Sequence, residues 1–143
     1  RAGRTGKPAT VYFQTYENNS KMISEITNEN PDIFLERELE IRKKNKLPPY
    51  QRFISLILTG ENEKKLEKEA FNFKNFIANK INGKILGPVN APIFRIKKKF
   101  RIRLLIRGSK SMKMQNSLAK IIPKYKFFKG IKLSVDVDPI NFN

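Results

Sequence analysis

The chain has 143 residues, and its 30 Lys and Arg against 13 Asp and Glu give a formal net charge of +17. It contains neither Cys nor His, which excludes disulfides, thiolate nucleophiles, Cys/His zinc sites and Ser-His-Asp triads within these residues. A hydrophobic share of 39% suffices for one core. The sequence has no run of about 18 apolar residues, so no membrane-spanning helix is expected. It also has no apolar segment of the kind that a secretory signal needs.

The positive charge is concentrated in the second half of the chain. Residues 84–143 contain 15 basic side chains and two acidic ones, Asp136 and Asp138. An A/T-rich genome would also raise the lysine content, so the arginines and the uneven distribution carry the argument. A basic half of this kind predicts that one face of the molecule, rather than its whole surface, binds a polyanion.

The first 46 residues predict a strand followed by two helices. Residues 8–16 are apolar enough for a buried strand, and Asn18, Asn19 and Ser20 form a turn and an N-cap for a short helix. After a break at 28–31, Asp32 is placed to cap a second helix that ends in the basic segment 42–46. The residues expected to face inward are Met22, Ile23 and Ile26 in the first helix, and Ile33, Leu35, Leu39 and Ile41 in the second.

Pro48-Pro49 predicts a domain boundary, because proline ends helices and restricts the residue before it. Beyond it the pattern predicts β-α-β-β-α-β. The strands are expected at 53–59, at 84–86 with 93–96, at 100–107 and at 131–137; the helices are expected at 61–81 and from Ser109 or Ser111. The inward residues of the longer helix are predicted to be Leu66, Ala70, Phe73, Ile77 and Ile81. This α+β order is typical of a split βαβ, ferredoxin-like fold.

Alternation along residues 100–107 predicts a row of cations. Phe100, Ile102, Leu104 and Ile106 would face one side, and Arg101, Arg103 and Arg107 the other. Arg95, Lys97, Lys98 and Lys99 come just before this strand. Arginine suits the phosphates of a nucleic-acid backbone, so this strip is a candidate nucleic-acid surface. A solvated sheet face, partly paired with Asp136, is the alternative.

Aromatic residues near the C-terminus have two possible uses. Tyr125, Phe127 and Phe128 alternate with lysines and are able to stack on bases, although core packing is the commoner use of such residues.

The opening residues Arg1-Ala2-Gly3-Arg4 resemble the second half of the last conserved motor motif of superfamily 2 helicases, Q-x-x-G-R-x-G-R. In that family both arginines reach the γ-phosphate of the nucleotide, where they stabilise charge that develops in phosphoryl transfer. The resemblance implies these roles for Arg1 and Arg4, with Gly3 permitting a tight backbone. It also implies that the rest of the motif precedes Arg1.

Further matches, in conserved order, extend along the whole chain and resemble the C-terminal end of the primosomal helicase family PriA (primosomal protein N prime). They are Lys7-Pro8, Val11 and Gln14-Thr15; Phe34, Arg37-Glu38-Leu39 and Arg42; Leu47-Pro48-Pro49-Tyr50; Leu86-Gly87-Pro88 and Ala91-Pro92-Ile93; Arg95 and Phe100-Arg101; and Val135-Asp136-Val137-Asp138-Pro139.

This resemblance implies a part of an ATP-dependent 3′-5′ DNA helicase that binds stalled or branched forks and initiates primosome assembly. Residues 1–46 would end a RecA-like motor lobe, and residues 47–143 would form a ferredoxin-like or ribosomal-protein-like DNA-binding domain. The family uses ATP and Mg²⁺ and carries zinc further upstream, with no metal held by these residues. Implied partners are branched and single-stranded DNA, other primosome proteins and single-stranded DNA-binding protein, the last near Lys110, Lys113 and Gln115. The implied location is the cytoplasm.

A second interpretation stays open from the residues alone. A stand-alone RNA- or ribosome-binding module of ferredoxin-like fold would explain the charge and the second half, but not residues 1–15.

Overall fold

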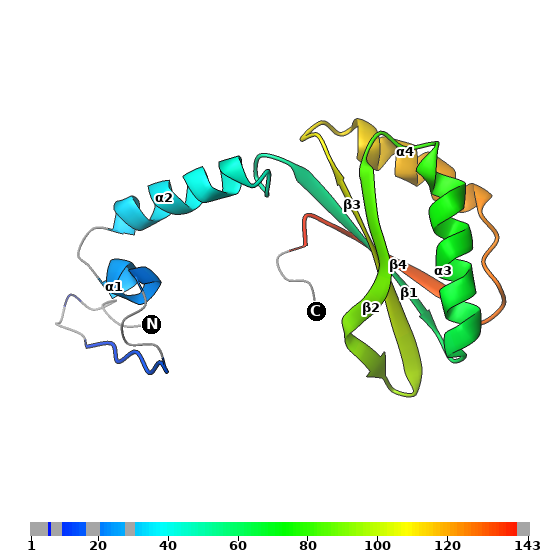
Figure 1. Ribbon diagram of the computed structural model, residues 1–143, viewed down its shortest axis with the longest axis horizontal. Helices are drawn as coiled ribbons and strands as arrows, with labels where there is room; N and C mark the ends of the chain where they lie inside the picture. The colour runs from blue at the N-terminus through cyan, green and yellow to red at the C-terminus, as the bar shows by residue number, and fades with distance from the viewer. Residues whose placement is uncertain (1–5, 7–9, 17–20, 28–30, 140–143) are drawn as a thin grey trace. The chain divides into compact units, whose positions relative to one another are not determined.

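The computed structural model describes residues 6, 10–16, 21–27 and 31–139, and the chain divides into two compact units, 1–41 and 42–143 (Figure 1). The division lies near the boundary predicted after residue 46. In the part of the chain that is described, no helix is long and apolar enough to cross a membrane.

In the first unit, the two predicted helices are present as α1 (Lys21–Thr27) and the start of α2 (Pro31–Lys44). An ion pair between Arg37 and Glu25 links them. Asp32 does not cap α2, because the helix already begins at Pro31, a residue suited to the first helical position. Asp32 instead lies in the first turn, where a carboxylate still opposes the helix dipole.

Two predictions for this unit are wrong. Residues 10–16 form no strand, and Val11, Tyr12, Phe13 and Tyr16 are exposed. A strand needs a backbone partner, and the described residues of this unit offer none. The α2 residues expected to face inward are also exposed: Ile33, Leu35, Leu39 and Ile41. Among the described residues of this unit, no surface packs against these four side chains.

The second unit has the predicted β-α-β-β-α-β order. Its strands are β1 (Arg52–Gly60), β2 (Lys84–Ile96), β3 (Lys99–Gly108) and β4 (Lys132–Val137); its helices are α3 (Glu63–Ala78), α4 (Lys113–Ile121) and the 3₁₀ turn η1 (Ile122–Lys124). The strands form one antiparallel sheet in the order β2-β3-β1-β4. Figure 1 shows α3 and α4 on the same side of this sheet.

The core lies between that face of the sheet and the two helices. From β1 and β3 it takes Ile54, Leu56, Leu58, Ile102, Leu104 and Ile106; from α3 and the turn after it Leu66, Ala70, Phe73, Ile77 and Ile81; and from α4 Met114 and Leu118. All five positions predicted for the longer helix and its C-terminal extension are therefore confirmed as core. The helix itself is shorter than predicted, since Asn62 caps it by accepting the backbone N–H of Lys65 at 2.9 Å.

The helix α4 begins later than either serine predicted. Met112 occupies the capping position and its side chain makes no capping hydrogen bond. The hydroxyls of Ser109 and Ser111 lie 3.0 Å apart and bond to each other instead. Neither serine therefore occupies the capping position of α4.

The two predicted extended segments after residue 84 are one strand, β2, with two irregularities in its pairing to β3. At the first of these, Gly87 has a φ of +92°, and a Cβ there would lie 2.7 Å from the carbonyl oxygen of Arg103. Only glycine fits such a position. Lys74 of α3 donates to the Gly87 carbonyl at 2.6 Å, which attaches this irregular part of the edge strand to the helix.

The aromatic cluster before β4 serves the core. Tyr125 and Phe127 lie 5.0 Å and 4.9 Å from Phe73 between ring centroids, whereas Phe128 is exposed. Burial raises the pKa of the Tyr125 hydroxyl, and the nearby Glu69 carboxylate raises it further. Core packing is thus the observed use of the first two aromatics.

Glu69 of α3 is a buried carboxylate that the sequence pattern did not single out. It is 1% exposed, and its Oε1 accepts the backbone N–H of Phe128 at 2.9 Å. A buried carboxylate needs partners, and this bond satisfies Oε1 and attaches the segment before β4 to α3.

Replacing Glu69 by alanine should lower the free energy of unfolding by about 2 kcal/mol or more, because Phe128 loses its acceptor and a cavity forms. Glu69→Gln keeps an acceptor oxygen and should lose less. Urea unfolding followed by circular dichroism measures both variants. Equal stability of Glu69→Ala and wild type would show that this bond contributes nothing.

Candidate nucleic-acid interface

The outward row of β3 carries the predicted arginines. Ile102, Leu104 and Ile106 are buried in the core, so the pleat sends Arg101, Arg103 and Arg107 to the face that neither α3 nor α4 covers. All three are half-buried. The alternation predicted from the sequence is confirmed.

The neighbours of this row on β1 are uncharged. Arg101, Arg103 and Arg107 pair with Thr59, Ile57 and Phe53 of β1. On the other side Val89 of β2 pairs with Arg103, and Lys84 pairs with Arg107. Apolar neighbours suit the aliphatic stems of these half-buried arginines.

An acidic residue, Asp136, shares this face but lies two strands away. It pairs with Ser55 of β1, and Ser55 pairs in turn with Leu105 of β3. Arg101 donates to a neutral group, the carbonyl of Ile93, at 3.3 Å. Among the strands of this sheet, β3 therefore contributes the most cations to this face.

The turn between β2 and β3 is made of two lysines. Arg95 pairs with Phe100 and Ile96 with Lys99, which leaves Lys97 and Lys98 as a two-residue loop with φ of +48° and +66°. Two positive φ values define a type I′ turn, which normally prefers Asn-Gly. Both lysines are exposed, so the hairpin tip presents two cations at some cost in backbone energy.

Arg95 and Lys99 lie beside this tip but have contacts of their own. The Arg95 guanidinium lies 5.1 Å from the ring centroid of Phe100, a residue of the inward row. Lys99 approaches Glu61 at 4.0 Å. Arg95 is thus displaced from the outward row of arginines, whereas the sequence had grouped it with them.

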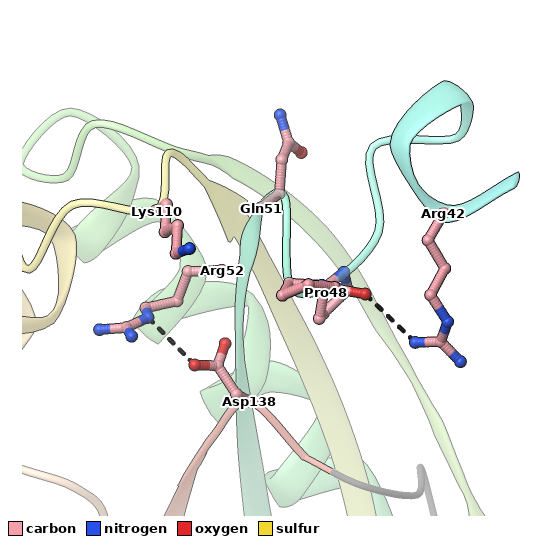
Figure 2. A pocket seen from close by; sticks show the side chains of 7 residues that line it. Arg42, Pro48, Gln51, Arg52, Lys110 and Asp138 are labelled. Carbon is pink, nitrogen blue, oxygen red and sulfur yellow. Dashed lines mark hydrogen bonds and ion pairs between the residues drawn. The ribbon is translucent and has the colours of Figure 1, made fainter. Parts of the chain in front are cut away.

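A pocket of about 400 Å³ lies at the opposite end of β3. It is lined by Arg42, Pro48, Pro49, Gln51, Arg52, Lys110 and Asp138. Figure 2 shows the side chains of Arg52 and Lys110 on one side of the pocket and that of Arg42 beyond Pro48. Arg42 donates to the Pro48 carbonyl at 3.2 Å. All of these residues belong to the second unit.

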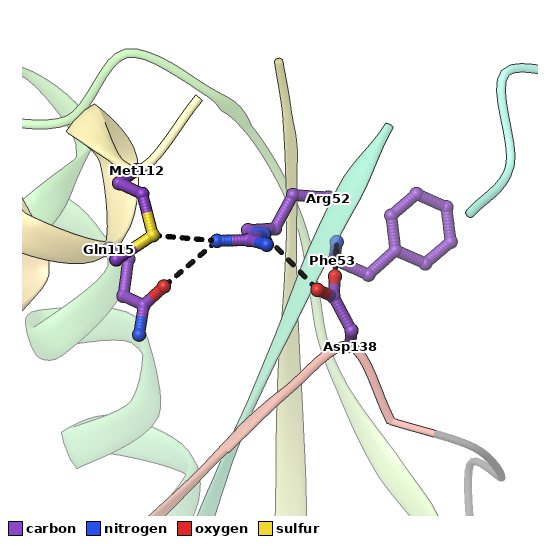
Figure 3. Close-up of polar contacts among 5 residues, drawn as sticks. All are labelled: Arg52, Phe53, Met112, Gln115 and Asp138. Atoms are coloured by element: carbon purple, nitrogen blue, oxygen red, sulfur yellow. Dashed lines mark hydrogen bonds and ion pairs between the residues drawn. The ribbon is translucent and has the colours of Figure 1, made fainter. Parts of the chain in front are cut away.

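Arg52 is the centre of a polar network beside this pocket (Figure 3). Its Nε lies 3.1 Å from Asp138 Oδ2, and its Nη1 donates to Gln115 Oε1 at 3.0 Å. Asp138 Oδ1 accepts the Phe53 N–H at 3.0 Å, and the Asp138 N–H donates to the Phe53 carbonyl at 2.7 Å. Asp138 has a φ of +53°, which aspartate tolerates better than most residues.

Comparison with known proteins identifies the family. The family model for the C-terminal domain of primosomal protein N matches residues 43–140. The chain belongs to the PriA family. Proteins named replication restart protein PriA match it at 36% identity in Rickettsia typhi, 31% in Synechocystis and 29% in Bacillus subtilis, over 99%, 100% and 97% of this chain. The chain spans 22%, 17% and 18% of those relatives.

The residues that the PriA resemblance implied for other roles are only partly described. Arg1, Gly3 and Arg4 lie outside the described residues. Lys110 lines the pocket, and Gln115 accepts from Arg52 and lines a mostly apolar groove of about 280 Å³ with Leu118 and Val135. Lys113 is the exposed first residue of α4.

Sequence reasoning did not select Arg52, and it noted Arg42 as a family match and as part of the basic end of a helix, not as a binding residue. The signal was present, since Leu47-Pro48-Pro49-Tyr50 and the closing residues up to Asp138-Pro139 were both recognised as PriA-like. Arg52, two residues after the first segment, forms an ion pair with Asp138 of the second.

Replacing Lys97-Lys98 by Asn-Gly should change stability and nucleic-acid affinity in opposite directions. The free energy of unfolding should rise by roughly 1–2 kcal/mol, because the preferred type I′ residues remove the backbone cost. Affinity should fall, because two cations are lost. Urea unfolding and fluorescence anisotropy with labelled DNA measure the two quantities, and a variant that binds as tightly as wild type would remove the tip from the interface.

Proposed function

We propose that this chain is the part of a PriA protein that binds branched or single-stranded DNA at stalled forks, in support of primosome assembly and replication restart. The observation that carries the proposal is the row of Arg101, Arg103 and Arg107 on a sheet face left open by α3 and α4. The names of the relatives and of the matching domain model support the same role.

The geometry favours contact with the phosphate backbone over the recognition of bases. Arginine forks bind phosphates in a directional way, and alternate residues of a strand lie about 7 Å apart, so the row follows an extended polyanion. Binding of this kind releases counterions and depends steeply on salt. It positions DNA without selecting its sequence.

The alternative, a stand-alone RNA- or ribosome-binding module, explains the charge but is less well supported. Sheet-based RNA modules stack bases on exposed aromatic residues. On this face Phe53 is the aromatic residue of β1, and it is 6% exposed. The PriA relatives also match over 97% or more of the chain, which is more than the second half alone. Comparing affinity for forked DNA with affinity for structured RNA separates the two functions.

The finer architecture supports this assignment. We infer a split βαβ, ferredoxin-like domain, because the strand order β2-β3-β1-β4 with two helices on one face is what that topology requires. We assign it to residues 47–143, and residues 1–46 to the tail of a RecA-like motor lobe. A ribosomal-protein-like module is the related description of this domain.

The longer protein is proposed to be an ATP-dependent 3′-5′ helicase that uses Mg²⁺. Arg1 and Arg4 would contact the γ-phosphate, and Gly3 would permit their close approach. Zinc would belong to another part of that protein. Single-stranded DNA-binding protein would place its acidic tail near Lys110, Lys113 and Gln115, where cations adjoin an apolar groove.

Arg101→Glu should weaken binding of the 143-residue chain to forked DNA by roughly tenfold and flatten the salt dependence, because one phosphate contact becomes a repulsion. The matched control is Lys68→Glu, which makes the same charge change at an exposed position of α3. Fluorescence anisotropy at several salt concentrations provides both quantities. If both variants lose affinity equally, total charge rather than the arginine row governs binding.

Arg4→Ala in the longer protein should abolish ATP turnover and leave DNA affinity within about twofold, since the arginine acts on the transferred phosphoryl group. A coupled ATPase assay and an anisotropy titration measure the two activities. Unchanged turnover would remove Arg4 from the mechanism. The 143-residue chain by itself should show no turnover above buffer.

A further inference from the structure

The pocket at the start of β1 has the composition of an anion site. Three of its seven lining residues are cationic, Arg42, Arg52 and Lys110, and one is acidic, Asp138. That carboxylate is already engaged by the Phe53 N–H and by Arg52. Lys110 is exposed. An entering anion therefore meets surplus positive charge, and the acidic group that would oppose it is bonded elsewhere.

Arg52 is oriented before any ligand arrives. Asp138 holds its Nε and Gln115 holds its Nη1, from the end of β4 and from α4 respectively (Figure 3). An arginine fixed by two partners loses less side-chain entropy on binding than a free one. This preorganisation distinguishes the pocket from a group of solvated surface lysines.

The pocket also continues the arginine row. Arg107 pairs with Phe53, and the next residue, Gly108, pairs with Arg52; Lys110 follows two positions later. The ten residues of β3 span about 33 Å, which is close to one turn of a DNA duplex at about 34 Å. Cations thus lie at the hairpin tip, along β3 and at the pocket.

We infer that this pocket binds a phosphate group of the nucleic acid that crosses the arginine row. The inference rests on the proposed function and extends it to a site at the end of the sheet. A carboxylate of an acidic peptide has similar chemistry, and Lys110 is also among the residues proposed above for the acidic tail of single-stranded DNA-binding protein. The continuity with Arg107 favours the nucleic-acid backbone in this pocket, and the tail would then use Lys113 and the apolar groove beside Gln115. The pocket would fix the position of the strand along β3, and Arg101 and Arg103 would hold the strand against the sheet.

The test compares Lys110→Ala with Lys68→Ala in the 143-residue chain. Both variants lose one positive charge at an exposed lysine, so they share the same net charge. Anisotropy with a labelled duplex of about 12 base pairs, somewhat longer than one turn, is measured at several salt concentrations. Lys110→Ala should bind roughly fivefold more weakly with a slope reduced by about one, and Lys68→Ala should match wild type.

The possible outcomes separate this inference from the proposed function. If both lysine variants bind like wild type while Arg101→Glu binds weakly, the pocket is not a phosphate site and the arginine row stands. If wild type itself fails to bind DNA, the proposed function fails and the inference fails with it. If Lys110→Ala weakens an acidic peptide with a free C-terminus but not DNA, the pocket is a peptide site and the inference is overturned.

Inorganic phosphate provides an independent probe without DNA. In ¹H–¹⁵N spectra of the 143-residue chain, titrated phosphate should shift the amide signals of Gln51, Arg52 and Lys110 in wild type. These shifts should be smaller in Lys110→Ala at the same ionic strength. Shifts that spread evenly over the lysines of the chain would overturn the inference.

Discussion

The pleat of β3 is the constraint on which the second unit depends. Ile102, Leu104 and Ile106 are almost fully buried against α3 and α4, and this burial fixes the register of the strand. A slip by one residue would send the arginines into the core and the aliphatic residues into water. The core therefore determines the interface, since the arginines face outward because their neighbours must face inward.

The ends of the sheet depend on polar contacts instead. At one end Asp138 adopts a left-handed conformation and continues the β1–β4 pairing through its side chain and backbone. The same carboxylate holds Arg52, which in turn reaches α4. One residue thereby links three elements, and the basic pocket is formed where they meet. The contacts of Asp138 thus both stabilise this end of the sheet and orient the guanidinium group of Arg52.

The predictions from sequence succeeded where local pattern and burial agree. The rows of β3 and the inward face of α3 follow from alternation and helical spacing, and both are confirmed. The strand predicted at residues 8–16 is wrong among the described residues, because an apolar pattern does not supply a hydrogen-bonding partner. The start of α4 was misplaced, because Ser109 and Ser111 bond to each other rather than to the helix.

Other features were beyond any local pattern. Arg52 meets Gln115 across 63 positions of sequence, and Glu69 meets Phe128 across 59. No spacing rule connects residues so far apart, and a glutamate beside Ala70 on a helix looks like an ordinary solvated residue. The hairpin tip differs in kind: Lys97 and Lys98 contradict the residue preference of a type I′ turn. Asn-Gly would make the same turn at a lower backbone cost, but it would leave the tip uncharged. The positive charge that the two lysines add beside the row of arginines is therefore the best explanation for their presence in this turn.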